Sequence, residues 1–244
     1  MANPEEYLPS APATRTTMSD HPTQQEVIHP QPVDFSSKVD RVIAYLASRG
    51  FVFEPWQVAA FIAAVRTKPF VILAGISGTG KTKLPRLIAE ATEAECLIVP
   101  VRPDWSDSSD LLGYERLNGS FQPGSLLRFA EKAQSEPEKQ FFFVLDEMNI
   151  ARVEYYLAEV LSHLEERHPD GNGRFTSGPL MPYVRETEDG KNWSQVRLPD
   201  NLCIVGSVNM DETTYGFSKK VLDRAFVIEF STVDLSAIGE VTPS

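Results

Sequence analysis

One short segment, Gly75–Thr82, constrains the fold of this chain more than any other part of the sequence. It reads Gly-Ile-Ser-Gly-Thr-Gly-Lys-Thr, with glycines at its first and sixth positions followed by a lysine and a threonine. An apolar run, Phe70–Ala74, precedes it and is typical of a buried parallel strand. Apolar residues at helical spacing follow it, namely Leu84, Leu87, Ile88 and Ala91. A strand, a glycine-rich turn and a helix in this order predict a phosphate-binding loop.

The residue types of this loop suit a nucleoside triphosphate, ATP or GTP, bound with Mg²⁺. Its glycines allow backbone N–H groups to curl around phosphate oxygens, and the following helix points its positive end at the anion. Lys81 would bring a positive charge to the terminal phosphates, and the Thr82 hydroxyl would bind Mg²⁺. Ser77 is not in a nucleophile elbow, because Thr79 replaces the second glycine of that motif. The predicted nucleotide-binding residues of the loop are Gly75, Ser77, Gly78, Thr79, Gly80, Lys81 and Thr82.

Two consecutive acids follow a second buried strand. The apolar run Phe141–Leu145 ends in Asp146 and Glu147. In open parallel sheets the carboxyl ends of the strands are where ligands bind. We therefore expect Asp146 to hold Mg²⁺ together with Thr82, partly through water, and Glu147 to polarise the water that attacks the terminal phosphate. The alternative is a strand that simply ends in two solvated acids.

Two polar residues further along the chain are candidates for the same chemistry. The apolar run Leu202–Val208 leads into Asn209, whose amide would orient the attacking water, although asparagine is also common in turns. Arg224 stands just before the last predicted strand and would face away from its own site. We expect it to neutralise charge in the site of a neighbouring subunit. The alternative is a surface salt bridge with Asp223 or Glu229.

The remaining chain alternates between predicted strands and helices. A polar stretch rich in Gly and Pro, 168–199, is predicted to form a surface hairpin. Repeated strand–helix units predict an α/β fold with a parallel sheet between two layers of helices. Further helices are predicted around Val39–Leu46 and at Pro55–Arg66, 125–134, Ile150–Leu164 and 218–223, and further strands at Cys96–Val101 and Ala225–Phe230.

Charge and cysteine content narrow the class of protein. The chain has 244 residues, a formal net charge of −11 and two cysteines, Cys96 and Cys203. Such an acidic chain lacks the basic footprint that broad, unassisted nucleic-acid binding needs. Two isolated cysteines in apolar runs make neither a disulfide framework nor a metal site, which favours buried thiols in a reducing compartment. Without a signal sequence or an apolar stretch of about 20 residues, we expect a cytoplasmic protein with no membrane segment.

Composition also divides the chain into parts. Residues 1–34 are rich in Pro, Ser, Thr and Gln and show no hydrophobic periodicity, so we expect a disordered tail. The predicted organisation continues with an N-terminal helical linker at 35–69, a nucleotide-binding core at 70–232 and a short C-terminal tail at 233–244.

Taken together, these elements resemble the AAA+ ATPases, and more narrowly the McrB-type branch, the motor subunit of modification-dependent restriction systems. The resemblance covers roughly residues 38–230. The phosphate loop and the acidic pair are general to the superfamily, whereas the Asp-Trp and Asp-Glu-Met-Asn-Ile-Ala-Arg elements are more specific. The segments that carry the resemblance are Gly75–Thr82, Val101–Trp105, Asp110–Tyr114, Leu145–Glu154 and Gly206–Met210.

This resemblance implies a P-loop αβα sandwich with a five-stranded parallel sheet, assembled as a ring that is expected to be a hexamer. The stretches 110–124 and 168–199 lie where the branch inserts hairpins near the ring pore. A McrC-like nuclease subunit is the implied partner, and DNA would be reached only indirectly or through it. Arg152 is a weaker candidate for a subunit contact. The matching functional positions are Lys81 and Thr82 for Walker A, Asp146 and Glu147 for Walker B, Asn209 for the first sensor and Arg224 for the arginine finger.

Two departures limit what the resemblance implies. Where the branch carries Met-Asn-x-x-Asp, linked with GTP use, this chain has Val208 and Glu212, so that ATP or GTP stays open and ATP is favoured as the superfamily default. About 14 residues follow Phe230, so we expect the helical lid and its second sensor arginine to be missing. The leading hypothesis is an NTP hydrolase module. The alternative is a lid-less, non-catalytic nucleotide-binding scaffold or regulator.

Overall fold

The computed structural model describes residues 35–184, 192–210 and 215–230. The predicted tails at 1–34 and 233–244, and Glu212, lie outside the described residues. The helices are α1 (Phe35–Ser48), α2 (Pro55–Thr67), α3 (Lys83–Ala91), α4 (Ser109–Leu112), α5 (Ser125–Ser135), α6 (Val153–Tyr156), α7 (Ala158–Glu165) and α8 (Lys219–Leu222), with 3-10 turns at Met148–Ile150 and Trp193–Gln195. The strands are β1 (Phe70–Gly75), β2 (Glu95–Pro100), β3 (Gly113–Glu115), β4 (Phe121–Pro123), β5 (Phe141–Asp146), β6 (His168–Pro169), β7 (Phe175–Thr176), β8 (Leu202–Asn209) and β9 (Phe226–Phe230).

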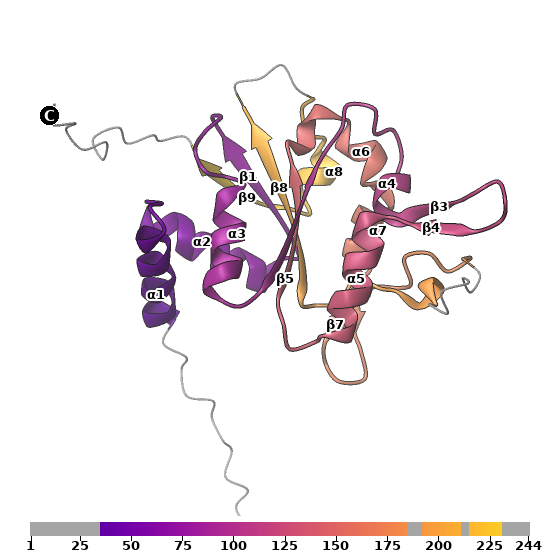
Figure 1. The fold of residues 1–244 in the computed structure, drawn as a ribbon, viewed down its shortest axis with the longest axis horizontal. Coiled ribbons are helices and arrows are strands. Elements are labelled where there is room, and N and C mark those ends of the chain that lie inside the picture. Colours follow the sequence, from indigo (N-terminus) through magenta and orange to yellow (C-terminus); the bar gives the residue numbers. More distant parts are fainter. Residues whose placement is uncertain (1–34, 185–191, 211–214, 231–244) are drawn as a thin grey trace, which may run out of the picture. The chain divides into compact units, whose positions relative to one another are not determined.

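Five strands form one all-parallel sheet in the order β2-β5-β8-β1-β9 (Figure 1). This confirms the predicted α/β class and the five-stranded parallel sheet. β8 lies between β1 and β5, and its register pairs Asn209 with Gly75 and Gly206 with Leu145. The carboxyl ends of β1, β5 and β8 therefore meet at one edge of the sheet, where parallel sheets bind their ligands.

Helices cover both faces of the sheet, and each face buries its own apolar cluster (Figure 1). Successive side chains of β5 alternate between the two, because Phe141 and Phe143 belong to one cluster and Phe142 and Val144 to the other. The first cluster includes side chains of α5 and α7, and the second includes side chains of α1, α2 and α3. The predicted linker at 35–69 thus packs onto the sheet, while its boundary with the core stays a prediction.

The single long helix predicted at Ile150–Leu164 is wrong. A 3-10 turn, α6 and α7 take its place, because Ala151 is extended with φ −118° and ψ 167° and Leu157 leaves helical geometry with φ −105° and ψ 1°. The apolar spacing still has meaning. Residues of both short helices, such as Val153 and Val160, are buried in the same cluster, so the periodicity reported a shared buried face rather than one continuous helix.

The stretch 168–199 only partly matches the predicted surface hairpin. A hairpin is present, but β6 and β7 have two residues each, with Pro169 paired to Phe175. Four apolar side chains beyond it are buried in the first cluster, which makes this part of the stretch core rather than surface. These side chains are Leu180, Trp193, Val196 and Leu198. At 110–124 the structure does contain a hairpin, in which Gly113 of β3 pairs with Pro123 of β4.

The expectation that both cysteine thiols are buried is confirmed for only one of them. Cys203 is buried, and burial raises the pKa of its thiol to about 12. Cys96 is only half-buried, so the prediction that both thiols are buried is wrong for this residue, although burial still raises its pKa to about 11. Among the described helices, none has the length and apolar character needed to cross a bilayer.

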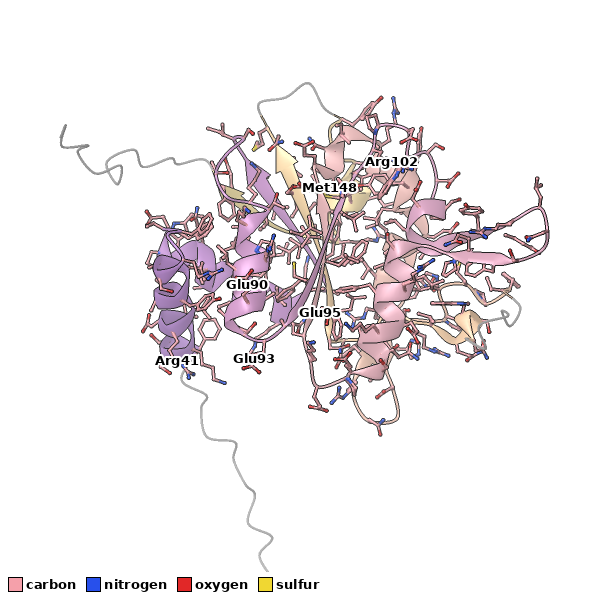
Figure 2. The ribbon with its side chains drawn as sticks, in the orientation of Figure 1. Arg41, Glu90, Glu93, Glu95, Arg102 and Met148 are labelled. Atoms are coloured by element: carbon pink, nitrogen blue, oxygen red, sulfur yellow. The ribbon has the colours of Figure 1, made fainter. Side chains whose placement is uncertain are left out.

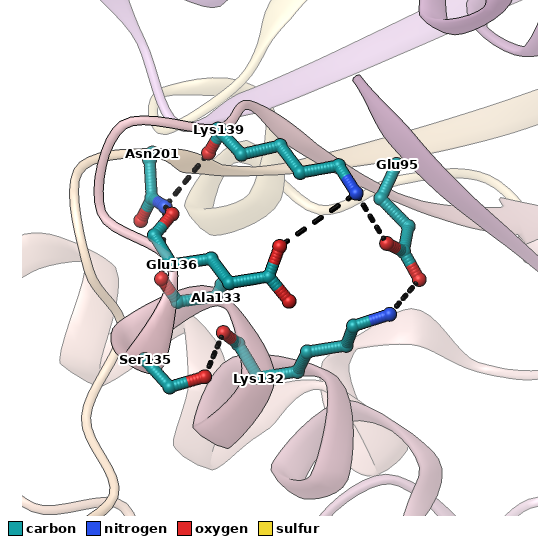
Figure 3. A network of polar contacts seen from close by, with 7 residues as sticks. All are labelled: Glu95, Lys132, Ala133, Ser135, Glu136, Lys139 and Asn201. Carbon is teal, nitrogen blue, oxygen red and sulfur yellow. Dashed lines mark hydrogen bonds and ion pairs between the residues drawn. The ribbon is translucent and has the colours of Figure 1, made fainter. Parts of the chain in front are cut away.

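A polar network holds the amino-terminal edge of the sheet, opposite the carboxyl ends of the strands (Figure 3). Glu95, the first residue of β2, forms ion pairs with Lys132 and with Lys139, the latter at 2.9 Å. Hydrogen bonds from these two lysines hold the pKa of the Glu95 carboxyl below its usual value. The Asn201 amide nitrogen lies within 2.9 Å of three backbone carbonyl oxygens at the end of α5 and in the following turn. This network ties α5, β2 and the start of β8 together.

Candidate functional site

The predicted phosphate loop connects the end of β1 to the start of α3. Gly78 and Gly80 have φ values of 83° and 82°, a region that strongly favours glycine. A Cβ atom at Gly80 would lie 3.0 Å from the ring of Phe53, so the segment between α1 and α2 packs directly against the loop. The glycines therefore serve both the turn geometry and the close packing of this loop.

Lys81 points into the loop rather than into solvent. Its side chain is unusually shielded for a lysine, with the residue only 5% exposed. The ammonium Nζ donates to the carbonyl oxygen of Ile76 at 2.5 Å and to Thr79 Oγ1 at 3.4 Å. A shielded ammonium needs oxygen partners, and phosphate oxygens would be stronger ones than those the loop itself supplies.

The start of α3 contacts the end of β5 through a pair of side chains. Thr82 Oγ1 donates to Asp146 Oδ1 at 2.5 Å, although the two residues are 64 positions apart in the chain. The same carboxylate oxygen accepts a second hydrogen bond, at 2.6 Å, from Ser207 Oγ on β8. The two predicted magnesium ligands thus lie side by side, held in place by a third residue.

The second acid contacts the neighbouring strand end. Asn209 Nδ2 donates to Glu147 Oε1 at 3.1 Å, and Asn209 is buried in the structure. Asn149 in turn donates to the backbone oxygen of Asn209 at 3.4 Å. The structure therefore brings Glu147 and Asn209 together beside Asp146 and the loop.

The oxygen donors at this edge fit Mg²⁺ held jointly with phosphates. Mg²⁺ prefers oxygen ligands and usually keeps several waters, bound by one or two carboxylates together with substrate phosphates. Asp146 and Thr82 offer one carboxylate and one hydroxyl at the mouth of the loop. Among the described residues there is no group of three or more His, Cys, Asp or Glu that could hold a metal without a ligand. The carboxylate of Asp146 and the hydroxyl of Thr82 therefore fit a metal that is also bound by phosphate oxygens.

Arg224 lies away from these residues. It precedes β9, whose first residue pairs with Val71 near the start of β1. The phosphate loop follows Gly75, at the opposite end of β1. In a parallel sheet these positions are on opposite edges, so Arg224 does not join the site formed by its own chain.

The partners of Arg224 differ from those considered from the sequence. Its guanidinium forms an ion pair with Glu165 at the end of α7, and its Nη1 donates to the carbonyl of Lys220 at 2.7 Å. The alternative of a surface salt bridge with Asp223 or Glu229 therefore has the wrong partner, because the acid is Glu165 of α7. The Arg224 side chain is only 17% exposed, so most of it is buried against its own chain in this structure.

Arg152 is held within its own chain by two aromatic rings. Its guanidinium carbon lies 5.7 Å from the ring centroid of Tyr155 and 5.0 Å from that of Tyr215. Cation–π contacts at these distances contribute modestly at exposed sites. The weaker expectation that Arg152 makes a subunit contact stays a prediction.

Sequence reasoning missed Ser207. Its hydroxyl contacts Asp146 at 2.6 Å and the backbone nitrogen of Glu147 at 2.9 Å, and the residue is 2% exposed. The available signal was a hydroxyl within an otherwise apolar strand, two positions before Asn209. That position has the same side-chain direction as Asn209, because side chains alternate along a strand.

Comparison with known proteins places these observations in a family. Residues 70–226 match the AAA domain family, dynein-related subfamily. The chain is also similar to the Type IV methyl-directed restriction enzyme EcoKMcrB subunit of Escherichia coli, with 27% identity over 185 residues, which cover 73% of this chain and 38% of that protein. It is similar to the Lon protease of Halothermothrix orenii as well, with 26% identity over 190 residues, which cover 78% of this chain and 20% of that protein.

The matched regions are therefore a part of each relative, and the chain spans well under half the length of either. The family match, in contrast, covers most of the chain, from the first residue of β1 to the first residue of β9. It includes the loop, both acids and Asn209. The chain belongs to the dynein-related subfamily of AAA domains.

Proposed function

We propose that this chain is an AAA module that binds and hydrolyses a nucleoside triphosphate, in a motor similar to McrB. One observation carries the proposal. The loop residue Thr82 and the first acid, Asp146, share a hydrogen bond of 2.5 Å, and the second acid, Glu147, is held by Asn209 at 3.1 Å. The residues proposed to bind phosphate, to bind the metal and to act as the base thus meet at one edge of the sheet.

Nucleotide binding falls to the loop and the start of α3. Backbone N–H groups of the loop would surround the phosphates, and Lys81 would neutralise the terminal ones. Thr82 and Asp146 would hold Mg²⁺, with Asp146 acting partly through water. When bound, the metal would neutralise charge on the phosphate oxygens. ATP is the favoured substrate, with GTP as the alternative.

Hydrolysis falls to Glu147 and Asn209. The oxygen of a water would attack the terminal phosphorus while the bond to the leaving diphosphate oxygen breaks. Glu147 would take the proton released by that water, as a general base. Asn209 donates to one oxygen of the Glu147 carboxylate, which leaves the other oxygen for the water. The two residues therefore divide the work of orienting the water and accepting its proton.

Arg224 is proposed to act on the nucleotide bound by a neighbouring subunit. Since it lies on the edge of the sheet opposite its own loop, it can reach a nucleotide only in a neighbouring copy. This fits a ring of copies, which we propose to be a hexamer. In that ring Arg224 would leave Glu165 and approach the neighbour's terminal phosphate. A McrC-like nuclease is the proposed partner, with DNA contacted indirectly or through it.

Glu147→Gln tests the proposed base. The amide keeps the size of the side chain but accepts no proton at neutral pH, so phosphate release should fall by about a hundredfold or more. Binding of a fluorescent ATP analogue with Mg²⁺ should stay within about threefold of wild type, since the loop is intact. Glu159→Gln, on an exposed part of α7, is the matched control. Normal turnover by Glu147→Gln would exclude the assigned role.

A second function, nucleotide binding without turnover, is favoured by one observation. In the isolated chain the guanidinium of Arg224 forms an ion pair with Glu165, so in this state it does not extend toward a neighbouring subunit. Gel filtration with ATP and Mg²⁺, combined with phosphate release over a range of protein concentrations, separates the two functions. Turnover that rises with assembly supports the hydrolase. A monomer that binds nucleotide but releases no phosphate at any concentration supports the binding module.

A further inference from the structure

The two acids of the site do not follow the normal alternation of a strand. Consecutive side chains of an extended strand point to opposite faces of the sheet. Glu147, however, has φ 53° and ψ 48°, in the left-handed region that is unfavourable for a residue with a Cβ atom. This bend turns its carboxylate toward Asn209, beside Asp146. The arrangement of the two acids therefore depends on whatever holds the bend.

Ser207 contacts both sides of this bend. Its Oγ lies 2.9 Å from the backbone nitrogen of Glu147 and 2.6 Å from Asp146 Oδ1. A backbone N–H can only donate, so Ser207 accepts there, and its own proton is directed to Asp146. Because the residue is 2% exposed, water does not replace either hydrogen bond.

The residue before Ser207 supports the same bend from β8. A Cβ atom at Gly206 would lie 1.9 Å from Met148 Sδ, so Met148 packs directly on the backbone of the strand. Tyr156 donates its hydroxyl to the carbonyl oxygen of Met148 at 2.8 Å, and burial raises the pKa of that hydroxyl. Figure 2 shows Met148 near the carboxyl end of the sheet, while Glu95 lies toward the other end.

We propose that Ser207 is a positioning residue, which fixes the orientation of the metal-binding carboxylate and the backbone bend of the catalytic one through a single hydroxyl. This inference rests on the proposed function and assigns Ser207 two effects. It sets the direction of Asp146 toward the metal position, and it holds Glu147 where its carboxylate meets Asn209. Thr82 supplies the other hydrogen bond to Asp146 Oδ1 and would also be a metal ligand, whereas the hydroxyl of Ser207 is shared between Asp146 and the backbone of Glu147.

The structure also argues against a simple packing role for this serine. A buried serine that only fills space in a strand commonly returns its proton to a nearby backbone carbonyl. The hydroxyl of Ser207 is instead hydrogen-bonded to Asp146 and to the backbone nitrogen of Glu147. A packing role would predict that any small residue suffices at this position, whereas a positioning role requires a hydroxyl.

Three variants separate these roles. Ser207→Ala removes the hydroxyl, Ser207→Thr keeps it, and Cys203→Ala trims a buried side chain on the same face of the same strand as a control. Each is studied by phosphate release, by titration of a fluorescent ATP analogue in EDTA and at increasing Mg²⁺, and by thermal denaturation. The metal titration is repeated in a Glu147→Gln background, where it reports on Asp146 without turnover.

For Ser207→Ala we expect kcat to fall about tenfold or more, which is less than the roughly hundredfold loss expected for removal of the base itself, because Ser207 acts only through the two acids. The Mg²⁺ concentration for half-maximal binding should rise severalfold, while affinity in EDTA and the Tm stay near wild type. Ser207→Thr and Cys203→Ala should retain both properties. Wild-type kcat and metal dependence in Ser207→Ala, or equal impairment of Ser207→Thr, would overturn the proposal. If the wild-type chain releases no phosphate, the proposed function fails, yet the metal titration still decides the role of Ser207.

Discussion

The acidic residues at the two edges of the central sheet have different kinds of partners. At the amino-terminal edge, Glu95 is held between Lys132 and Lys139 (Figure 3). At the carboxyl edge, Asp146 is held by two hydroxyls and Glu147 by an amide. Within the part of the chain that the structure describes, neither of these two acids has a lysine or arginine at ion-pair distance.

This difference separates residues that stabilise the fold from residues available to a ligand. An acid paired with its own lysines has little attraction left for an external cation. An acid held only by neutral donors keeps its negative charge for a metal, although its desolvation lowers the stability of the free chain. We therefore expect mutations at the amino edge to change the free energy of unfolding, and mutations at the carboxyl edge to change ligand binding and turnover.

Arg224 could break this comparison, because it lies on the amino side of the sheet and yet has a proposed catalytic role. Arg224→Ala should lower turnover by about a thousandfold, as for other arginines that act across a subunit boundary. Its own loop should still bind nucleotide. Mixing Arg224→Ala with Glu147→Gln should restore part of the phosphate release, because the second variant can lend its arginine to the first. Mixtures with no more activity than the separate variants would argue against action in a neighbouring subunit.

Asp146→Asn gives the next largest effect and tests the carboxyl edge directly. The amide oxygen can still accept hydrogen bonds from Thr82 and Ser207, but the charge that attracts Mg²⁺ is lost. Turnover should fall by about a hundredfold or more, and Mg²⁺ should no longer tighten nucleotide binding. The Tm of the nucleotide-free chain should stay equal or rise. A lower Tm with an unchanged response to Mg²⁺ would contradict the comparison.

Asn201→Ala tests the amino edge. The change removes the donor shared by three backbone carbonyls near the end of α5. Unfolding in urea should show a loss of about 1–3 kcal/mol, the range expected when buried or partly buried carbonyls lose their partner. Affinity for an ATP analogue should not change, because the phosphate loop lies at the other edge. A loss of affinity without a loss of stability would reverse the assignment of the two edges.

Glu95→Gln should have the smallest effect, below about 1 kcal/mol, because the ion pairs of Glu95 are partly exposed. The lysines lower its pKa from the ordinary value of 4.5. Its stabilising contribution is thus present above pH 4.5 and is lost as pH falls through the lowered value. Urea midpoints measured from pH 6 down should fall more steeply for wild type than for Glu95→Gln. Parallel pH curves would show that the pairs contribute nothing.

Much of this architecture could be predicted from the sequence because its signals are local. The phosphate loop, the apolar strand before it and the acidic pair at the end of β5 are each contiguous in the chain. Parallel strands then bring Gly75, Asp146 and Asn209 to one edge by topology alone. The structure confirms contacts at these strand ends, because Thr82 is hydrogen-bonded to Asp146 and Asn209 to Glu147, while the catalytic roles of these residues stay predictions.

The features that could not be predicted depend on contacts between distant residues. A serine in an apolar strand has no local motif, and only the position of β8 beside β5 reveals that Ser207 meets Asp146. The partner of Arg224 lies 59 positions earlier in the chain, in α7. The break in the helix near Leu157 could not be predicted, because apolar spacing indicates which face of a segment is buried and not whether its backbone is one continuous helix.

The central place of β8 also governs when the site can exist during synthesis. β1 pairs with β8 and β9, so both of its partners are made after residue 200. A nascent chain that carries Gly75–Thr82 and Asp146 has no strand to join them until Asn209 has left the ribosome. Contacts over such sequence separations also form slowly. We therefore expect incomplete chains to be unable to retain nucleotide, which makes nucleotide binding a mark of chains that have finished the sheet.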